Sequence, residues 1–109
     1  MAAFASTTTL APNFRMRRRI IGTGFSILCG TLDITNYNKT TVEITDITKH
    51  FRAKPTVIFD ISDNGYWFGW NASTGHVKVW QNASSGACTE CDDEEDAGKA
   101  NFIAVGVEQ

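Results

Sequence analysis

The residues best suited to metal or redox chemistry are Cys88 and Cys91, which are followed by five consecutive acids at residues 92–96. Two thiolates at this spacing can both bind zinc, but a closed structural site needs four ligands. The further ligands would have to come from Cys29, His50 or His76. A redox pair is the second alternative, although no βαβ pattern surrounds the motif. Since only half of a zinc site is visible, the sequence favours a third alternative, a polar loop with two incidental thiols.

The acids at residues 92–96 are also candidate ligands for Ca²⁺. An EF-hand loop, however, alternates its ligands along the chain and has a central glycine, whereas these residues are consecutive acids. We therefore predict a charged, solvated loop and no bound metal or other cofactor.

Four arginines form the second candidate site. They are Arg15, Arg17, Arg18 and Arg19. A guanidinium group binds phosphate and carboxylate equally well, so the cluster suits nucleic acid or acidic patches on another protein. A general nucleic-acid binder with a net charge of −2 would be repelled by the polyanion over most of its surface. Contact with another protein is therefore the favoured role of the arginine cluster, ahead of a solvated face and of nucleic-acid binding.

Two aromatic-rich segments, residues 66–70 and 76–80, flank a loop at residues 71–75 that contains Gly75. This pattern predicts a β-hairpin. If Trp67 faces inward with Gly69, the other aromatics of its strand share the opposite face. A stacking platform for single-stranded nucleic acid or sugar is one alternative, but burial of at least half of these rings in the core is favoured, with an interface next. The candidate interface aromatics are Tyr66, Phe68, Trp70 and Trp80.

Catalytic patterns are absent from the sequence. His50 and His76 fall in a predicted turn and at a predicted strand start, and neither a Gly-x-Ser-x-Gly motif nor a phosphate-binding glycine loop occurs. No pair of carboxylates is visibly placed for acid–base work. We expect a protein that is not an enzyme.

The composition sets the scale of the fold. A chain of 109 residues with 42% apolar and 20% charged residues fits one domain. Charge is distributed unevenly: the first 30 residues carry four Arg and no acid, whereas residues 61–109 carry eight acids against two lysines. A basic start and an acidic end allow complementary contacts with other copies of the chain or with a large partner.

The spacing of apolar residues is that of an all-β protein. Residues 1–14 lack apolar periodicity, so we predict an extended N-terminal arm that orders only on a partner. From residue 15 to 109, period-two stretches alternate with turn residues every eight to twelve positions, which predicts a single domain. Six to eight strands would form a small antiparallel β-sandwich or barrel.

In several predicted strands, the alternation of apolar residues indicates which side chains share a face. Val42 and Ile44 predict one face of a strand over residues 41–45, and Asp46 is placed to cap a helical turn that ends at Phe51. Further on, Val57, Phe59 and Ile61 share a face, and the turn at residues 62–65 contains an Asn-Gly pair that tolerates positive φ. Residues 101–107 carry apolar residues on both faces, which is typical of a strand covered on both sides.

The chain shows no basic-then-apolar signal segment at its start, and three cysteines do not make a disulfide framework, so folding in a cytoplasm is expected. The Asn-x-Ser/Thr sequons at Asn38, Asn71 and Asn82 are therefore interpreted as turn residues.

Taken as one block, residues 63–70, 75–80 and 101–106 resemble the decoration, or cement, proteins of tailed bacteriophages. In that family a Gly-Tyr-x-Phe strand, a tight turn, a Lys-Val-Tyr/Trp strand and a terminal Ala-Val/Ile-Gly strand recur. The resemblance covers roughly the last 45 residues, and its motifs are structural. The cysteines and the acidic run depart from the family's Gly/Ala-rich loop, so the role of this loop does not follow from the resemblance.

The resemblance implies a homo-oligomer, dimer or trimer, on the outer surface of a phage head, made in the host cytoplasm and bound to the major capsid protein. No membrane is expected as a partner. In that setting the arm's apolar side chains and the arginines are the capsid contacts: Phe4, Leu10, Phe14, Arg15, Arg17, Arg18 and Arg19. Two alternatives remain: a small nucleic-acid-binding β-barrel, and a tail-associated or receptor-binding virion module.

Overall fold

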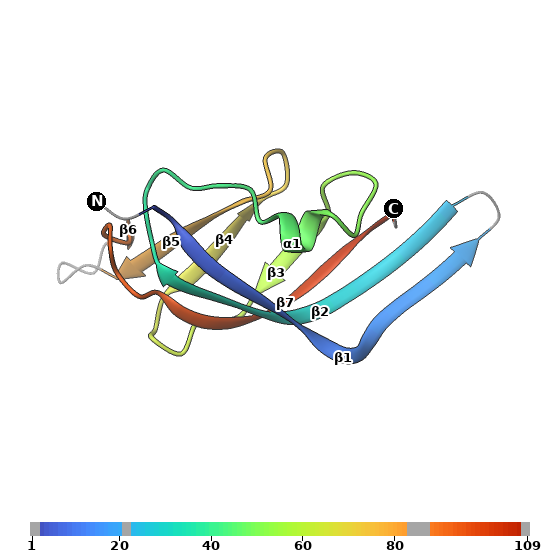
Figure 1. Cartoon of the computed structure of the whole chain (residues 1–109), viewed down its shortest axis with the longest axis horizontal. Coiled ribbons are helices and arrows are strands. Elements are labelled where there is room, and N and C mark those ends of the chain that lie inside the picture. Colours follow the sequence, from blue (N-terminus) through green and yellow to red (C-terminus); the bar gives the residue numbers. More distant parts are fainter. Residues whose placement is uncertain (1–2, 21–22, 83–87, 108–109) are drawn as a thin grey trace.

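The computed structural model describes residues 3–20, 23–82 and 88–107, with side chains described at residues 3–10, 26–82 and 88–107. In these residues seven strands form two antiparallel sheets (Figure 1). Sheet A contains, in spatial order, β1 (Ala5–Ile20), β2 (Thr23–Asn36), β7 (Gly98–Val107) and β3 (Thr56–Phe59). Sheet B contains β4 (Trp67–Asn71), β5 (His76–Asn82) and β6 (Cys88–Glu90). The predicted all-β fold of six to eight strands is confirmed.

The hydrophobic core lies between the facing sides of the two sheets. Strands β2 and β7 turn their even-numbered side chains inward, so that Leu32 and Phe102 are buried. Sheet B contributes Phe68, whose ring centroid lies 5.6 Å from that of Phe59 in an edge-on contact between the sheets. Alternation along each strand therefore gives one inward face per sheet.

Strand β1 replaces the expected free arm. Residues 5–10 pair with β2, from Ala5 opposite Asn36 to Leu10 opposite Gly30. The segment is rich in Ser and Thr and lacks apolar periodicity, but Thr suits a strand, and β2 offers it an unpaired edge. Between Leu10 and Arg15 the register shifts, because β1 has more residues there than β2. Pro12, which has no N–H to donate, lies in this irregularity of an edge strand.

The only helix of the described residues is the single turn α1 (Thr45–Thr48). A helical turn was expected here, but Asp46 lies inside its first turn and the N-cap is Ile44, without a side-chain cap bond. The predicted strand at residues 41–45 is wrong: only Glu43 forms a bridge, with His76, because the chain turns into α1 at Thr45. No described helix is long and apolar enough to cross a membrane.

Only two of the three residues expected on the inward face of β3 point into the core. Val57 is buried and Phe59 is half-buried against the core, as predicted. Ile61, by contrast, lies past the end of β3 in an isolated bridge to Trp67 and is 57% exposed. The end of the strand therefore breaks the period-two pattern.

Tyr37, the first residue after β2, connects the two sheets. Its side chain is fully buried, and its hydroxyl donates to Glu90 Oε2 at 2.6 Å while accepting from the Val79 N–H at 3.3 Å. Its backbone N–H and C=O bind Glu95 O and Glu94 N at 2.9 and 2.7 Å. Tyr37 thereby joins the end of sheet A to β5, to β6 and to the acidic loop.

Residue 30 must be a glycine because the backbone of β1 comes very close to β2 at this position. A Cβ added there would overlap the Thr9 carbonyl oxygen and lie 3.2 Å from the Phe102 ring. We therefore expect Gly30→Ala to lower the free energy of unfolding by about 1–3 kcal/mol, as overpacking does, measured by urea denaturation. Gly69→Ala is the matched control, since its nearest new contact is an ordinary 3.5 Å. Equal stability of the two variants would contradict the close approach of β1.

Candidate protein-binding surface

The cysteines do not form a metal site in the described part of the chain. Cys91 is fully buried and donates its backbone N–H to Val79 O at 2.8 Å, whereas Cys88 is exposed on β6. Cys29 lies on β2 opposite Ile103, in the other sheet. Among the described residues no group of three His, Cys, Asp or Glu side chains is placed to hold a metal ion.

Burial controls the chemistry of Cys91. Together with the neighbouring Glu95 and Asp92 carboxylates, which contribute less, burial raises the pKa of this thiol to about 11. Because the thiolate is the reactive form, Cys91 is protected from alkylation near neutral pH. The described geometry thus favours the interpretation of incidental thiols over zinc or a redox pair.

The raised pKa of Cys91 predicts alkaline destabilisation. An unfolded thiol loses its proton near 9.0, but the folded one holds it to about 11, so the stability from this group is intact below pH 9 and declines between these values. Between about pH 8 and about pH 10.5, the urea concentration at the midpoint of unfolding should therefore fall less for Cys91→Ala than for the wild type. Cys88→Ala, the control, should follow the wild type, and identical pH profiles for Cys91→Ala and the wild type would refute the assignment.

The aromatic hairpin is present, but most of its rings pack in or against the hydrophobic core. Phe68 is buried, Tyr66 and Trp70 pack against the core, and Trp70 Nε1 donates to Pro55 O at 2.9 Å. These three share one face, as expected, yet that face is the inner one, so the assumption that Trp67 points inward is wrong. Trp67 is 37% exposed and lies opposite Trp80 on the outer face of sheet B.

The turns of this hairpin follow the predicted chemistry. Gly65 and Gly75 have φ of 84° and 73°, in the left-handed region that favours glycine. Asn71 Oδ1 accepts the Ser73 N–H at 2.9 Å, and Asn38 Oδ1 accepts the Thr40 N–H at 2.8 Å. These two sequons are therefore Asx turns. The turn beyond Asn82, at residues 83–87, lies outside the described residues.

The two histidines lie in different surroundings. His76 Nδ1 is 2.9 Å from Thr41 Oγ1, at the start of β5, whereas His50 follows α1. The His76 ring is thus joined to a hydroxyl group, and His50 is half-buried. His50 therefore lies in a turn and His76 at a strand start, as the sequence predicted.

The predicted capsid contacts fall on β1. Phe4 packs edge-on against Tyr37, with ring centroids 6.0 Å apart, so this side chain belongs to the fold rather than to a free arm. Leu10 is 37% exposed. The remaining positions lie on the outer half of β1, and their side chains are outside the described ones: Phe14, Arg15, Arg17, Arg18 and Arg19.

Sheet A leaves an apolar surface on the side facing away from the core. Ile103 of β7 lies opposite Ile58 of β3 on one side and Cys29 of β2 on the other. Ile58, Ile103 and Val107 are 69%, 50% and 40% exposed. We call the following set the sheet A patch: Ile27, Cys29, Ile58, Ile103, Val105 and Val107.

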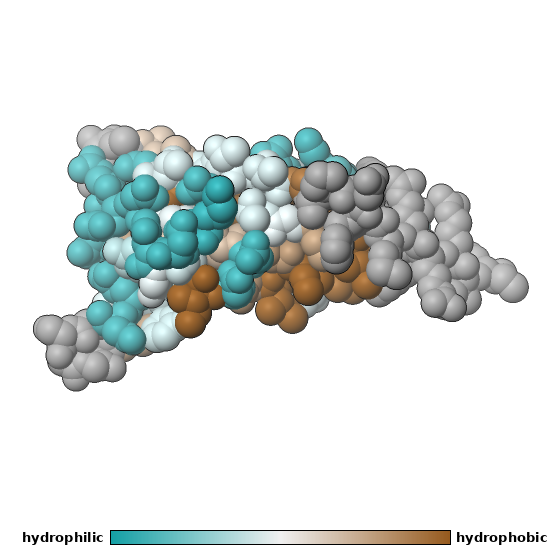
Figure 2. Space-filling model, turned by 90° about the horizontal axis from the view of Figure 1, so that it is seen from below, coloured by the Kyte–Doolittle hydropathy of each residue, from teal (hydrophilic) through white to brown (hydrophobic). Residues whose placement is uncertain are grey.

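The sheet A patch has an apolar centre and a polar border. A hollow of about 300 Å³ over β3 and β7 is lined by Ile58, Phe59, Asp60, Asn101, Phe102 and Ile103. Asp60 closes one end of it by accepting the Asn101 backbone and side-chain N–H groups at 2.8 and 2.9 Å. Figure 2 shows apolar surface gathered over the middle of this face and polar surface beside it. This arrangement is typical of a protein interface.

The sequence contained the signal for the sheet A patch. Residues 101–107 were expected to be covered on both sides because both faces of the strand are apolar. Within the described residues the inner face is covered by the core, whereas the outer face is open. No family model, no curated protein and no solved structure matches this chain.

Proposed function

We propose that the chain is a structural protein that binds another protein through the sheet A patch. The observation that carries the proposal is the row Cys29, Ile103 and Ile58 across three strands of sheet A, with both isoleucines at least half exposed. Burying one such side chain on a partner is worth about 1.5–3 kcal/mol. The exposed isoleucines offer an apolar surface on which another protein can dock.

The resemblance to phage decoration proteins supplies the partner in this proposal, which is the major capsid protein on the outside of a tailed-phage head. An exposed sheet face suits binding to an assembled lattice, because many copies can bind to its repeated sites. Each bound copy stabilises the assembled state by an amount set by its concentration relative to Kd. The N-terminal segment contributes as a strand of the sheet, not as a free arm.

The double variant Ile58→Lys/Ile103→Lys tests the patch. Two lysines facing a desolvated partner should weaken binding to undecorated heads about 100-fold or more, measured by cosedimentation. Val42→Lys is the matched control, because Val42 is 50% exposed but lies outside the patch. Single-stranded DNA serves as the parallel bait.

Unchanged binding of the double variant to heads would contradict the role of the sheet A patch. Binding of the wild type to DNA but not to heads, with a steep dependence on salt, would replace the proposal with the nucleic-acid alternative.

A further inference from the structure

The outer face of sheet B carries a polar hollow beside two indole rings. On β5 the side chains of His76, Lys78 and Trp80 share this face, because the two valines between them are fully buried. Trp67 of β4 lies opposite Trp80 on the same face. Lys78 and Trp67 are exposed, and the other two are half-buried. Polar and aromatic side chains therefore alternate along one accessible strand.

The hollow measures about 300 Å³, and every residue that lines it has a polar side chain. This volume is at the lower end of the range found for small-molecule sites. Its walls come from β4, β5, β6 and the segment after β2, so they are far apart in sequence. They include Lys39, Thr41, Asn71, His76, Lys78 and Glu90. We call this the sheet B hollow.

Contacts within the fold position the polar groups of the sheet B hollow. Thr41 Oγ1 is 2.9 Å from His76 Nδ1, so Nε2 is the second polar atom of that ring. Glu90 Oε2 accepts the buried tyrosine hydroxyl described above at 2.6 Å. The Lys78 ammonium lies 4.9 Å from the centroid of the Trp80 ring, in a cation–π contact where the hollow meets the indoles. Such fixed groups lose little freedom when a ligand binds.

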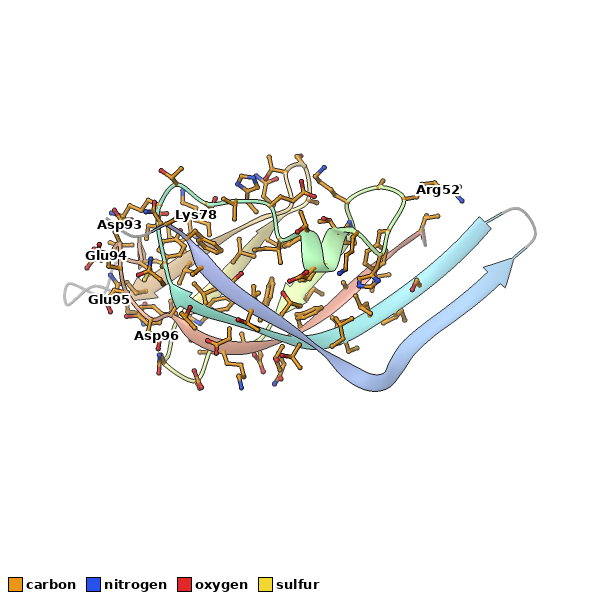
Figure 3. All side chains as sticks on the ribbon, viewed as in Figure 1. Arg52, Lys78, Asp93, Glu94, Glu95 and Asp96 are labelled. Carbon is orange, nitrogen blue, oxygen red and sulfur yellow. The ribbon has the colours of Figure 1, made fainter. Side chains whose placement is uncertain are left out.

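The charges around the sheet B hollow are mixed. Lys39 and Lys78 bring two positive charges, whereas Glu90 brings a negative one and Asp93 borders the hollow by accepting the Lys39 backbone N–H at 2.7 Å. Figure 3 shows Lys78 toward the same end of the molecule as the acidic side chains of residues 93–96. A polyanion such as nucleic acid would be repelled there. Adjacent donors and acceptors instead favour a neutral ligand rich in hydroxyl groups.

Gly69 leaves the face open between the hollow and the indoles. It lies inside β4, opposite Lys78, and a Cβ there would meet its nearest neighbour, Trp80 Nε1, at an ordinary 3.5 Å. Neither crowding nor a positive φ therefore requires a glycine at this position. A glycine inside a strand costs stability, and it often marks a place where a ligand approaches the backbone closely.

We propose that the outer face of sheet B binds a neutral saccharide. The C–H face of one sugar ring packs on the exposed Trp67 indole, and hydroxyl groups of the next sugar bond to Lys78, His76 and Glu90. From His76 to Trp80 the strand rises roughly 13 Å, which suits a short oligosaccharide better than a single sugar. The site uses no side chain of the sheet A patch and is independent of the function proposed above.

The three tryptophans of the chain give a readout in the unmodified protein. The protein is titrated with maltotriose, cellotriose, mannotriose and triacetylchitotriose, and the indole N–H signals are followed by NMR. The signals of Trp67 and Trp80 should shift and saturate with at least one of these probes. The signal of Trp70, whose Nε1 donates to Pro55 O beside the core, should stay in place and is the internal control.

Two substitutions test the assigned contacts. Trp67→Ala removes the ring surface and Lys78→Ala removes a charged donor, so each should weaken binding of that trisaccharide by about tenfold or more. Lys99→Ala is the matched control, because Lys99 is an exposed lysine on β7, in the other sheet, and should bind as the wild type does. All three variants should keep the circular dichroism spectrum of the wild type.

The absence of a saturable shift with all four trisaccharides overturns the proposal. Wild-type affinity in both Trp67→Ala and Lys78→Ala overturns it as well, since the saccharide would then bind elsewhere. Shifts of the same two indole signals with oligothymidylate but with no saccharide, steeply dependent on salt, would assign this face to single-stranded nucleic acid instead.

Discussion

The hydroxyl of Tyr37 is the contact on which the relative placement of the two sheets depends. It lies in a fully buried position, where a polar group needs partners, and it has two: the Glu90 carboxylate and the Val79 N–H. Burial and Glu90 raise the pKa of Tyr37, so the phenol stays a donor at physiological pH. Because the backbone of the same residue also binds the acidic loop, one residue joins the end of sheet A, the middle of β5 and the acidic loop.

This arrangement leaves sheet A with two unlike faces. Its inner face packs on sheet B through contacts such as Phe59 on Phe68, whereas on its outer face Ile58 and Ile103 remain exposed among the described residues. The outward residues of β7 are nevertheless apolar at Ile103, Val105 and Val107. A monomer gains nothing from exposed isoleucine, so this composition is best explained by a partner that covers the face.

Local chemistry made the hairpin at residues 66–82 predictable. Glycines at positions of positive φ, Asn side chains that bind the backbone two residues on, and period-two alternation all act within a few residues of sequence. Local chemistry did not indicate which of the hairpin's two faces points toward the core. Phe68 and Trp67 are both large and aromatic, and only the position of sheet A decides which of them is buried.

Non-local pairing accounts for the remaining differences. The Ser/Thr-rich segment of β1 has no apolar face, and its strand depends on the edge of β2 some 25 residues further on. Residues 41–45 have the alternation of a strand, but the edge of β5 next to them is already bound by Tyr37 and Cys91, so only Glu43 pairs with it. The exposure of the sheet A patch likewise depends on which strands pair with β7. That pairing is not encoded in any single segment of the sequence.

The central claim, that the sheet A patch binds a protein surface, can be tested in the unmodified chain with its own thiols. Cys29 lies in the patch, Cys88 is exposed on sheet B, and alkylation of both can be followed by mass spectrometry in the free and head-bound protein. The account predicts that binding to phage heads slows alkylation of Cys29 by about tenfold or more, while Cys88 reacts as before. An unchanged rate at Cys29 in the bound protein would contradict it.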